Sequence, residues 1–321
     1  MLKRYTIIPD PYEGQIASTG FSVLRPDSDQ LLGSFLFHLL GTADFYSYIE
    51  ANERGASYPA ISNRLVREYR IPVPPLAVQR EIVEILDTFT ELEAELEAEL
   101  EAELEARRRQ YEYYRDRLIA ESTTVRTSMG EVGKFVRGRR FTKADVVTSG
   151  IPSIHYGEIY TDYGVSATEA IRQIRAEMSP RLRFAVTGDV VMACVGETVE
   201  DVGKSVAWLG DDDVAIHDDT FLFRSDMNSK FVVYAIQTPE FQYQKVNYVS
   251  RAKVKRLSGL NLAKISIPTP SLAKQERVVE VLDKFDALVN DLNNGLPAEI
   301  AARRKQYEYY RDRLLTFEEA N

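Results

Sequence analysis

The sequence has few of the residues that form disulfides, metal sites or covalent nucleophiles. Among 321 residues it contains one cysteine, Cys194, and three histidines. A single thiol excludes an internal disulfide and fits a reducing compartment, so we expect a cytoplasmic protein with Cys194 in its core. No apolar run approaches the roughly 18 residues of a membrane-spanning helix, and no signal-peptide pattern opens the chain.

Motifs that carry catalysis are also missing. The sequence has no GxSxG nucleophile elbow and no GxGxxG dinucleotide fingerprint. Residues 196–205 (GETVEDVGKS) resemble a phosphate-binding loop, but six residues separate the two glycines where that loop needs four. His217, Asp218 and Asp219 could ligate a metal, yet no second histidine stands at a ligand spacing, so a polar turn is the better interpretation. We expect no catalytic residue, metal or cofactor in this chain.

Negative charge is concentrated in one segment. The chain has a formal net charge of -9, and residues 79–106 alone contain eleven acidic residues and one basic residue. The remaining residues carry a net charge of +1. The acidity of the whole chain therefore does not argue against a nucleic-acid partner.

A long internal repeat is the most specific feature. Residues 71–118, which begin IPVPPLAVQREIVEILDTF, align without a gap with residues 267–314, which begin IPTPSLAKQERVVEVLDKF. The offset is 196 positions, 28 of the 48 pairs are identical, and both segments end in RR(R/K)QYEYYRDRL. With small gaps the similarity extends upstream, where TGFSVLR near Phe21 matches DTFLFRS near Phe221 and SYPAISNRLVREYRIPVP (57–74) matches KVKRLSGLNLAKISIPTP (253–270). Two related modules of this size predict a doubled architecture rather than a solenoid.

Each repeated segment is predicted to be a long helix. After prolines that end an extended stretch, apolar residues recur at three- and four-residue spacing. We expect one spacer helix within residues 71–120 and another within residues 267–321, the second interrupted near Gly295 and Pro297. A lone helix of this length needs a partner for its apolar stripe, so we expect the two to pair as an antiparallel coiled coil.

A tetrapeptide repeat lies inside the first predicted helix. Residues 91–106 read ELEAELEAELEAELEA. The composition predicts a solvated and strongly helical spacer, to which each tetrapeptide adds about 6 Å of length.

Residues 121–266 are predicted to form a mixed α/β domain. Short strand-like runs such as VVMACV, SVAWL and TFLFR alternate with helical stretches. Residues 1–70 match only the second half of this domain, so we expect them to be the C-terminal part of a first domain that lacks its N-terminal half. The expected fold class is therefore α/β, with mixed α/β domains separated by two long helices.

Basic and aromatic residues of the second domain are candidates for binding DNA. KFVRGRRFTK (134–143) has five bases and no acid, and RAKVKR (251–256) has four bases. Such clusters bind phosphates and read base edges. The candidates are Lys134, Arg137, Arg139, Arg140, Lys143, His155, Tyr156, Glu158, Lys204, Arg251, Lys253 and Lys255.

The chain resembles the specificity subunits of type I restriction–modification systems. The resemblance rests on the two IP(V/T)P segments, both QYEYYRDRL strings and the tetrapeptide repeat between them, and it extends over essentially the whole chain. It implies two target-recognition domains, each reading one half of a split DNA sequence, held apart by conserved antiparallel helices. It also implies a non-catalytic subunit, with methylation of adenine by S-adenosylmethionine and DNA cleavage assigned to methyltransferase and restriction/translocase partners.

The doubled QYEYYRDRL string predicts two equivalent binding faces for two methyltransferase subunits. Tyrosine and arginine are favoured at the centres of protein interfaces. The candidates are Tyr111, Tyr113, Tyr114, Arg115, Tyr307, Tyr309, Tyr310 and Arg311. Alternatively, these residues only pack the two helices together. For the whole chain the alternative is a coiled-coil scaffold protein whose α/β modules bind other proteins.

Overall fold

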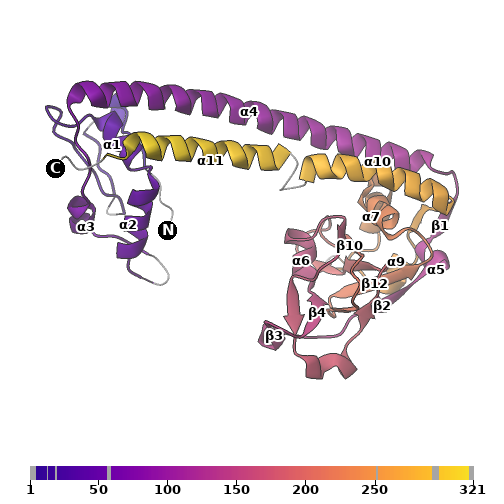
Figure 1. The fold of residues 1–321 in the computed structure, drawn as a ribbon. Helices are drawn as coiled ribbons and strands as arrows, with labels where there is room; N and C mark the ends of the chain where they lie inside the picture. Colours follow the sequence, from indigo (N-terminus) through magenta and orange to yellow (C-terminus); the bar gives the residue numbers. More distant parts are fainter. Residues whose placement is uncertain are drawn as a thin grey trace. The chain divides into compact units, whose positions relative to one another are not determined.

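The computed structural model in Figure 1 describes residues 5–12, 14–18, 20–55, 59–250, 252–290 and 296–317. The chain divides into two compact units, which are Met1–Leu104 with Leu292–Asn321 and Glu105–Asp291. Helix α4 (Leu76–Glu121) runs through both units. No helix in the described ranges has both the length and the apolar character of a membrane span.

Two five-stranded sheets form the centre of the second unit. The first has the order β2 (Gly133–Arg137), β12 (Thr220–Ser225), β8 (Val190–Ala193), β10 (Ser205–Trp208), β5 (Ser166–Ala167). The second has the order β3 (Val146–Val147), β6 (Arg172–Ile174), β4 (Ile151–Ile154), β11 (Val214–Ile216), β7 (Phe184–Ala185). Two short pairs join β1 (Arg126–Ser128) to β14 (Ser266–Pro268) and β13 (Lys255–Arg256) to β9 (Val195–Gly196).

The helices of this unit contact mainly the first sheet and one another. They are α5 (Met129–Val132), α6 (Tyr156–Thr161), α7 (Ser229–Gln237), α8 (Pro239–Val246), α9 (Gly259–Leu262) and α10 (Leu272–Asn290), with 3-10 turns η2 (Lys143–Asp145) and η3 (Ala176–Arg181). The mixed α/β fold expected from the sequence is confirmed in this unit.

The two sheets share one apolar core. Val191 and Trp208 from the first sheet belong to the same buried cluster as Ile154 and Val214 from the second. Every residue of β8 and β10 is buried, and α7 packs against β10. Burial on both faces explains why these strands read as continuous apolar runs instead of alternating ones. This core holds the strand ends, and the loops that leave them, in fixed positions.

The regular elements of the first unit, in its described residues, are helices. It contains η1 (Asp10–Tyr12), α1 (Gly33–Leu39), α2 (Ala43–Asn52), α3 (Asn63–Glu68), the first part of α4 and α11 (Leu296–Leu315). Phe35 and Leu39 of α1 pack with Ile82 and Leu86 of α4 and with Leu315 of α11. In the described part of residues 5–75 the only β interaction is one isolated bridge between Arg54 and Ala60.

The repeat extends further in the structure than the aligned residues 71–118. Helices α1, α2 and α3 correspond to α7, α8 and α9 at the same offset of 196, without a gap. Thr42 and Thr238 each cap the second helix of their set through the side-chain oxygen, and Ser62 and Ser258 cap the third.

The upstream match near Phe21 does not reflect equivalent elements. Residues 22–27 form no regular structure, whereas the matched segment near Phe221 is strand β12. The gaps that this match required are absent from the helices that follow, where the offset of 196 holds throughout.

The long helices pair antiparallel, as expected. In the first unit Phe89 of α4 contacts Tyr310 of α11, and Thr90 contacts Tyr307. Residue numbers therefore increase along α4 as they decrease along α11, which makes the two helices antiparallel. In the second unit α4 lies along α10 (Figure 1), with the Tyr114 and Phe285 rings stacked at 5.3 Å. The second long segment is described as two helices, α10 and α11, and Gly295 lies outside the described residues.

Candidate nucleic-acid interface and exposed helix faces

Most of the candidate DNA-binding side chains lie at one end of the two sheets. Strand register places Arg137 of β2 opposite Phe221 of β12, and Ile154 of β4 beside Ile216 of β11. The backbone N–H of Arg139 donates to the Ile216 carbonyl oxygen at 3.0 Å, which joins this end of the first sheet to the second. The candidates brought together here are Arg137, Arg139, Arg140, His155, Tyr156, Lys204 and Lys255.

Several cations at this end are exposed but anchored. The Arg137 guanidinium donates to the carbonyl oxygen of Asp218 at 2.7 Å. The Lys204 ammonium pairs with Asp201 at 3.0 Å and lies 5.4 Å from the centre of the Tyr160 ring. Anchoring of this kind reduces the entropy lost when a side chain binds a ligand. Arg137 and Lys204 therefore stand in defined positions, although Asp201 offsets the charge of Lys204.

An aromatic cluster lies among these cations. The His155 ring centre is 4.5 Å from that of Tyr156 and 4.4 Å from that of His217. Burial, and secondarily the neighbouring His217, lower the pKa of His155 to about 4. His155 is therefore neutral at physiological pH, which suits it to stacking or neutral hydrogen bonding rather than to phosphate binding.

Glu158 occupies a structural position rather than a reading position. Its side chain is 2% exposed, and its carboxylate accepts from the backbone N–H of His155 at 2.9 Å. A second oxygen lies 2.6 Å from the Nε of Arg172. The carboxylate thus completes a capping box at the start of α6. Its burial argues against the base-edge contact that the sequence suggested.

The remaining candidates lie elsewhere. Lys134 is exposed. In the strand register it lies opposite Arg224 of β12, toward the other end of β2 from Arg137. Lys143 is exposed in η2, and Lys253 is exposed just before β13. Arg251 lies outside the described residues.

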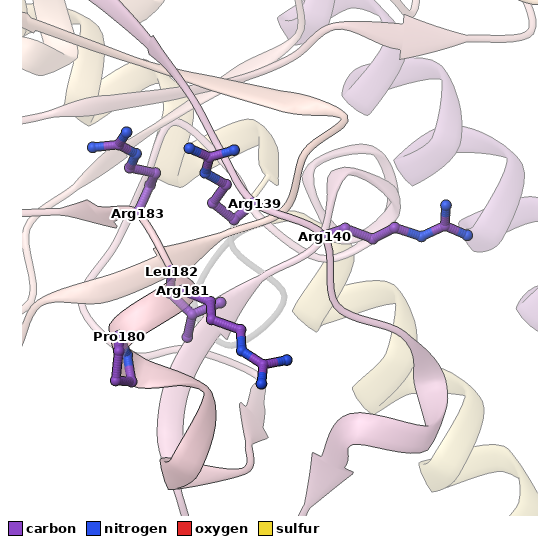
Figure 2. Close-up of a pocket in the computed structure, with 6 residues that line it drawn as sticks. All are labelled: Arg139, Arg140, Pro180, Arg181, Leu182 and Arg183. Carbon is purple, nitrogen blue, oxygen red and sulfur yellow. The ribbon is translucent and has the colours of Figure 1, made fainter.

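Two further arginines, which the sequence reading missed, join this surface. Arg181 and Arg183 line an open pocket of about 560 Å³ together with Arg139 and Arg140 (Figure 2). Their signal in the sequence is SPRLRF (179–184), in which the buried Leu182 separates two exposed arginines. The pocket joins segments about forty residues apart, so charge counting along the chain could not connect them.

The group His217–Asp218–Asp219 is a turn with its imidazole fully engaged. These three residues could hold a cation by distance alone. However, Nδ1 of His217 accepts from the backbone N–H of Asp219 at 3.2 Å, and Nε2 donates to the Phe141 carbonyl at 3.1 Å. No imidazole lone pair remains for a metal, so the residue fits the polar turn that the sequence suggested.

The eight candidate partner-binding residues separate into inward and outward sets. Tyr111 is buried, Tyr307 is half-buried, and the mostly buried Arg115 and Arg311 lie 5.8 and 5.7 Å from the ring centres of Tyr111 and Tyr307. These four side chains lie on the packed sides of their helices, which is the position expected if they pack the helices instead of binding a partner. By contrast Tyr113 is 58% exposed and Tyr309 is 59% exposed. The outward set is Tyr113, Tyr114, Tyr309 and Tyr310.

The outward tyrosines extend two matching apolar surfaces. The first exposed face consists of Ile85, Phe89, Leu92, Tyr309 and Tyr310. The second exposed face consists of Val281, Leu288, Tyr113, Tyr114 and the half-buried Phe285. Each residue of one face corresponds to a residue of the other at the offset of 196. Within each face the three aliphatic and phenyl side chains follow i, i+4, i+7 spacing, so they share one side of their helix.

Comparison with known proteins identifies the family. A model described as the type I restriction modification DNA specificity domain matches residues 4–106 and 203–302. The chain is 33% identical over 296 residues to a putative type I restriction enzyme specificity subunit of Haemophilus influenzae, covering 90% of this chain and 73% of that one. It is 33% identical over 274 residues to a type I restriction enzyme specificity subunit of Escherichia coli, covering 80% and 65%.

Solved structures share the fold. A chain from a study of assembly and conformational transition of the type I restriction–modification system matches with a TM-score of 0.71 and 22% identity, covering 96% of this chain and 77% of that one. The HsdS subunit from Thermoanaerobacter tengcongensis matches with a TM-score of 0.52 and 20% identity, covering 96% and 75%. The chain belongs to the family of type I restriction–modification specificity subunits.

Proposed function

We propose that the chain is a non-catalytic subunit that reads a bipartite DNA target and binds the methyltransferase and restriction subunits that act on it. The observation that carries the proposal is the doubled module, in which helices, caps and exposed faces recur at one offset of 196. A chain built from two related modules can meet two half-sites as a symmetric dimer does.

We assign DNA reading in the second unit to the sheet end that carries Arg137, Arg139, Lys204, His155 and Tyr156. The exposed cations supply charge for phosphates, and the neutral aromatic cluster supplies hydrogen-bonding and stacking groups for base edges. In the first unit the described residues provide the equivalents of α7, α8 and α9, while the strands that carry the candidate residues occur in the second unit.

The two exposed faces are assigned to partner subunits. Their tyrosine, phenylalanine and aliphatic side chains have the composition of interface centres. Two equivalent faces suit two copies of one partner, which we take to be the methyltransferase, with restriction subunits joining the same complex. S-adenosylmethionine and the methylated adenine then belong to the methyltransferase, and the whole assembly acts in the cytoplasm.

The test is a methylation map. Cells lacking other adenine methylation are given the methyltransferase alone, or the methyltransferase with this chain, and methylated adenines are located across the genome. We expect methylation in one sequence context only when both are present. Absence of methylation, together with no salt-dependent duplex binding by the purified complex, would support the alternative of a scaffold that binds other proteins.

A further inference from the structure

The pocket of Figure 2 gathers four arginines without an acidic residue. Arg139, Arg140, Arg181 and Arg183 line it with Pro180 and Leu182. Among the described residues, no ion pair includes any of these four arginines. The pocket therefore presents unneutralised positive charge from four side chains.

Buried anchors and one strand bring the two basic segments together. The backbone N–H of Arg139 donates to the carbonyl of Ile216 at 3.0 Å, and the N–H of Ile216 donates to the carbonyl of Arg183 at 3.0 Å. Phe141, which follows Arg140, and Leu182, which stands between Arg181 and Arg183, are buried in one apolar cluster. The arginine backbones are thus fixed by the second sheet, while their side chains extend outward.

Other arginines of the same unit are neutralised by neighbours. Arg172 pairs with Glu158 at 2.6 Å, Arg224 pairs with Asp189 at 2.6 Å, and Arg175 contacts Asp145. Grouping four cations without such partners costs free energy in the unbound protein, because like charges repel. An anionic ligand would remove that cost, and guanidinium groups are well shaped for phosphate oxygens.

The arrangement favours a chain of phosphates over one small anion. In Figure 2 the Arg139 and Arg183 guanidinium groups extend to the same side, whereas those of Arg140 and Arg181 extend in other directions. A single phosphate ion would need converging donors around it, while successive phosphates along a strand can each meet a different arginine.

We propose that this pocket binds backbone phosphates of duplex DNA and positions the second unit without reading bases. The inference rests on the proposed function, because it takes the sheet end next to the pocket as the reading surface. It adds Arg181 and Arg183 to the interface and gives all four arginines one role. Phosphate contacts fix orientation and register but carry no sequence information directly.

The experiment measures binding of the chain, complexed with its methyltransferase, to a pool of random-sequence duplexes at several KCl concentrations. For Arg139→Gln/Arg183→Gln we expect weaker binding and a salt slope reduced by about two, one for each phosphate contact. The bound fraction should be enriched in the same sequences as with the original chain. The matched control is Lys274→Gln/Arg277→Gln, which removes two exposed charges of α10 outside the pocket and should leave the slope nearly unchanged.

Three further arms separate the possible failures. Arg139→Lys/Arg183→Lys keeps the charges and should keep most of the slope, so an equal loss in this variant would mean a structural effect and overturn the inference. Inorganic phosphate should compete no better than KCl of equal ionic strength, and specific competition would assign the pocket to a free anion instead. No salt-dependent binding by the original chain would overturn the proposed function, whereas normal binding with unchanged slopes in the Gln variant would overturn only the pocket.

Discussion

At the residue scale, single contacts recur at the offset of 196 even where the side chains differ. Asp87 lies 2.8 Å from Nε2 of the buried His38, and its equivalent Asp283 accepts from the Tyr234 hydroxyl at 2.7 Å. Histidine and tyrosine present a polar atom at similar reach, so a helix-to-helix hydrogen bond survives the substitution. Asp87 and Asp283 are identical in the aligned repeat, whereas His38 and Tyr234 differ and lie upstream of it, so sequence identity alone does not reveal that the contact is equivalent.

Lys245 gives a prediction at this scale. The side chain is 1% exposed, and its Nζ donates to the carbonyls of Val202 at 2.7 Å and Glu200 at 3.2 Å. Burial lowers the pKa of Lys245 to about 8, against smaller raising effects from Glu200 and Asp201. Between pH 8 and the ordinary lysine pKa near 10.4, the unfolded chain therefore holds one more proton than the folded chain.

The contribution of Lys245 to the free energy of unfolding should consequently increase as the pH rises from 8 to about 10.4. Relative to Lys245→Met, the free energy of unfolding of the original chain should increase by about 2 kcal/mol from pH 8 to pH 10. Denaturant unfolding of both proteins at several pH values measures the difference, in which titration of other groups cancels. A difference that stays flat or falls would contradict the assigned charge state.

Residue identity alone did not show that Glu158 would be buried in a capping box, or that Arg181 and Arg183 would lie beside Arg139 and Arg140. The HYGE string (155–158) could have been read as a capping box, because a glutamate at the third helical position accepts from the backbone of the cap residue. The four-arginine pocket was beyond reach, since it depends on strand register around Ile216. Register is set by long-range pairing that no local pattern specifies.

At the element scale, the long helices were predictable because 3.6-residue periodicity is a local property. The acidic repeat within α4 behaves as its four-residue period requires: Leu92 is 56% exposed, whereas Leu100 is 8% exposed. Each step of four residues advances by about 400°, so successive leucines rotate around the helix. The acidic segment is also not solvated throughout, because Arg304 of α11 contacts Glu97 and lies 3.9 Å from Glu101.

Charge reversal at Arg304 tests this contact. Arg304→Glu places a third carboxylate beside Glu97 and Glu101, and should lower the free energy of unfolding of the first unit by about 1 kcal/mol at low salt. The loss should shrink at 0.5 M salt, where the Debye length is about half its value at physiological ionic strength. Arg303→Glu is the matched control, since Arg303 pairs with Glu299 of its own helix at 3.7 Å. An equal loss of unfolding free energy in both variants would mean that the contact of Arg304 with α4 is not its cause.

The two exposed faces predict the number of partners. Replacing Leu92 and Tyr309 by Glu should block the first face only, because both side chains are exposed and their loss disturbs little packing. Native mass spectrometry should then show one methyltransferase per chain instead of two. Replacing the equivalent Leu288 and Tyr113 should have the same effect, and combining all four changes should leave none bound. Two partners bound to every variant would exclude these faces.

At the scale of the whole molecule, the doubled module could be inferred from the sequence, but the arrangement of the strands in the second unit could not. The offset of 196 predicted two related modules joined by paired helices, and the structure carries that relation into the α1–α3 and α7–α9 sets. The two sheets of the second unit were foreseen only as short strand-like runs. Their order and their shared end depend on contacts between segments distant in sequence.

The tetrapeptide repeat of α4 gives the last prediction. Deleting Leu92–Glu95 leaves the same repeat one unit shorter, so Glu101 takes the place of Glu97 opposite Arg304. Local pairing with α11 is thereby preserved, while everything downstream in α4 moves by about 6 Å along the helix axis and rotates by about 40°.

If the length of α4 sets the separation of the two half-sites, this deletion should keep each half-sequence and shorten the unread gap by one or two base pairs, at about 3.4 Å each. Insertion of one tetrapeptide should lengthen the gap by the same amount. Methylation mapping of both variants with the methyltransferase measures half-sequences and gap in one experiment. Some loss of activity is expected, because the second exposed face includes Tyr113 and Tyr114 downstream of the deletion. A changed half-sequence with an unchanged gap would show that the length of α4 does not set the spacing of the target.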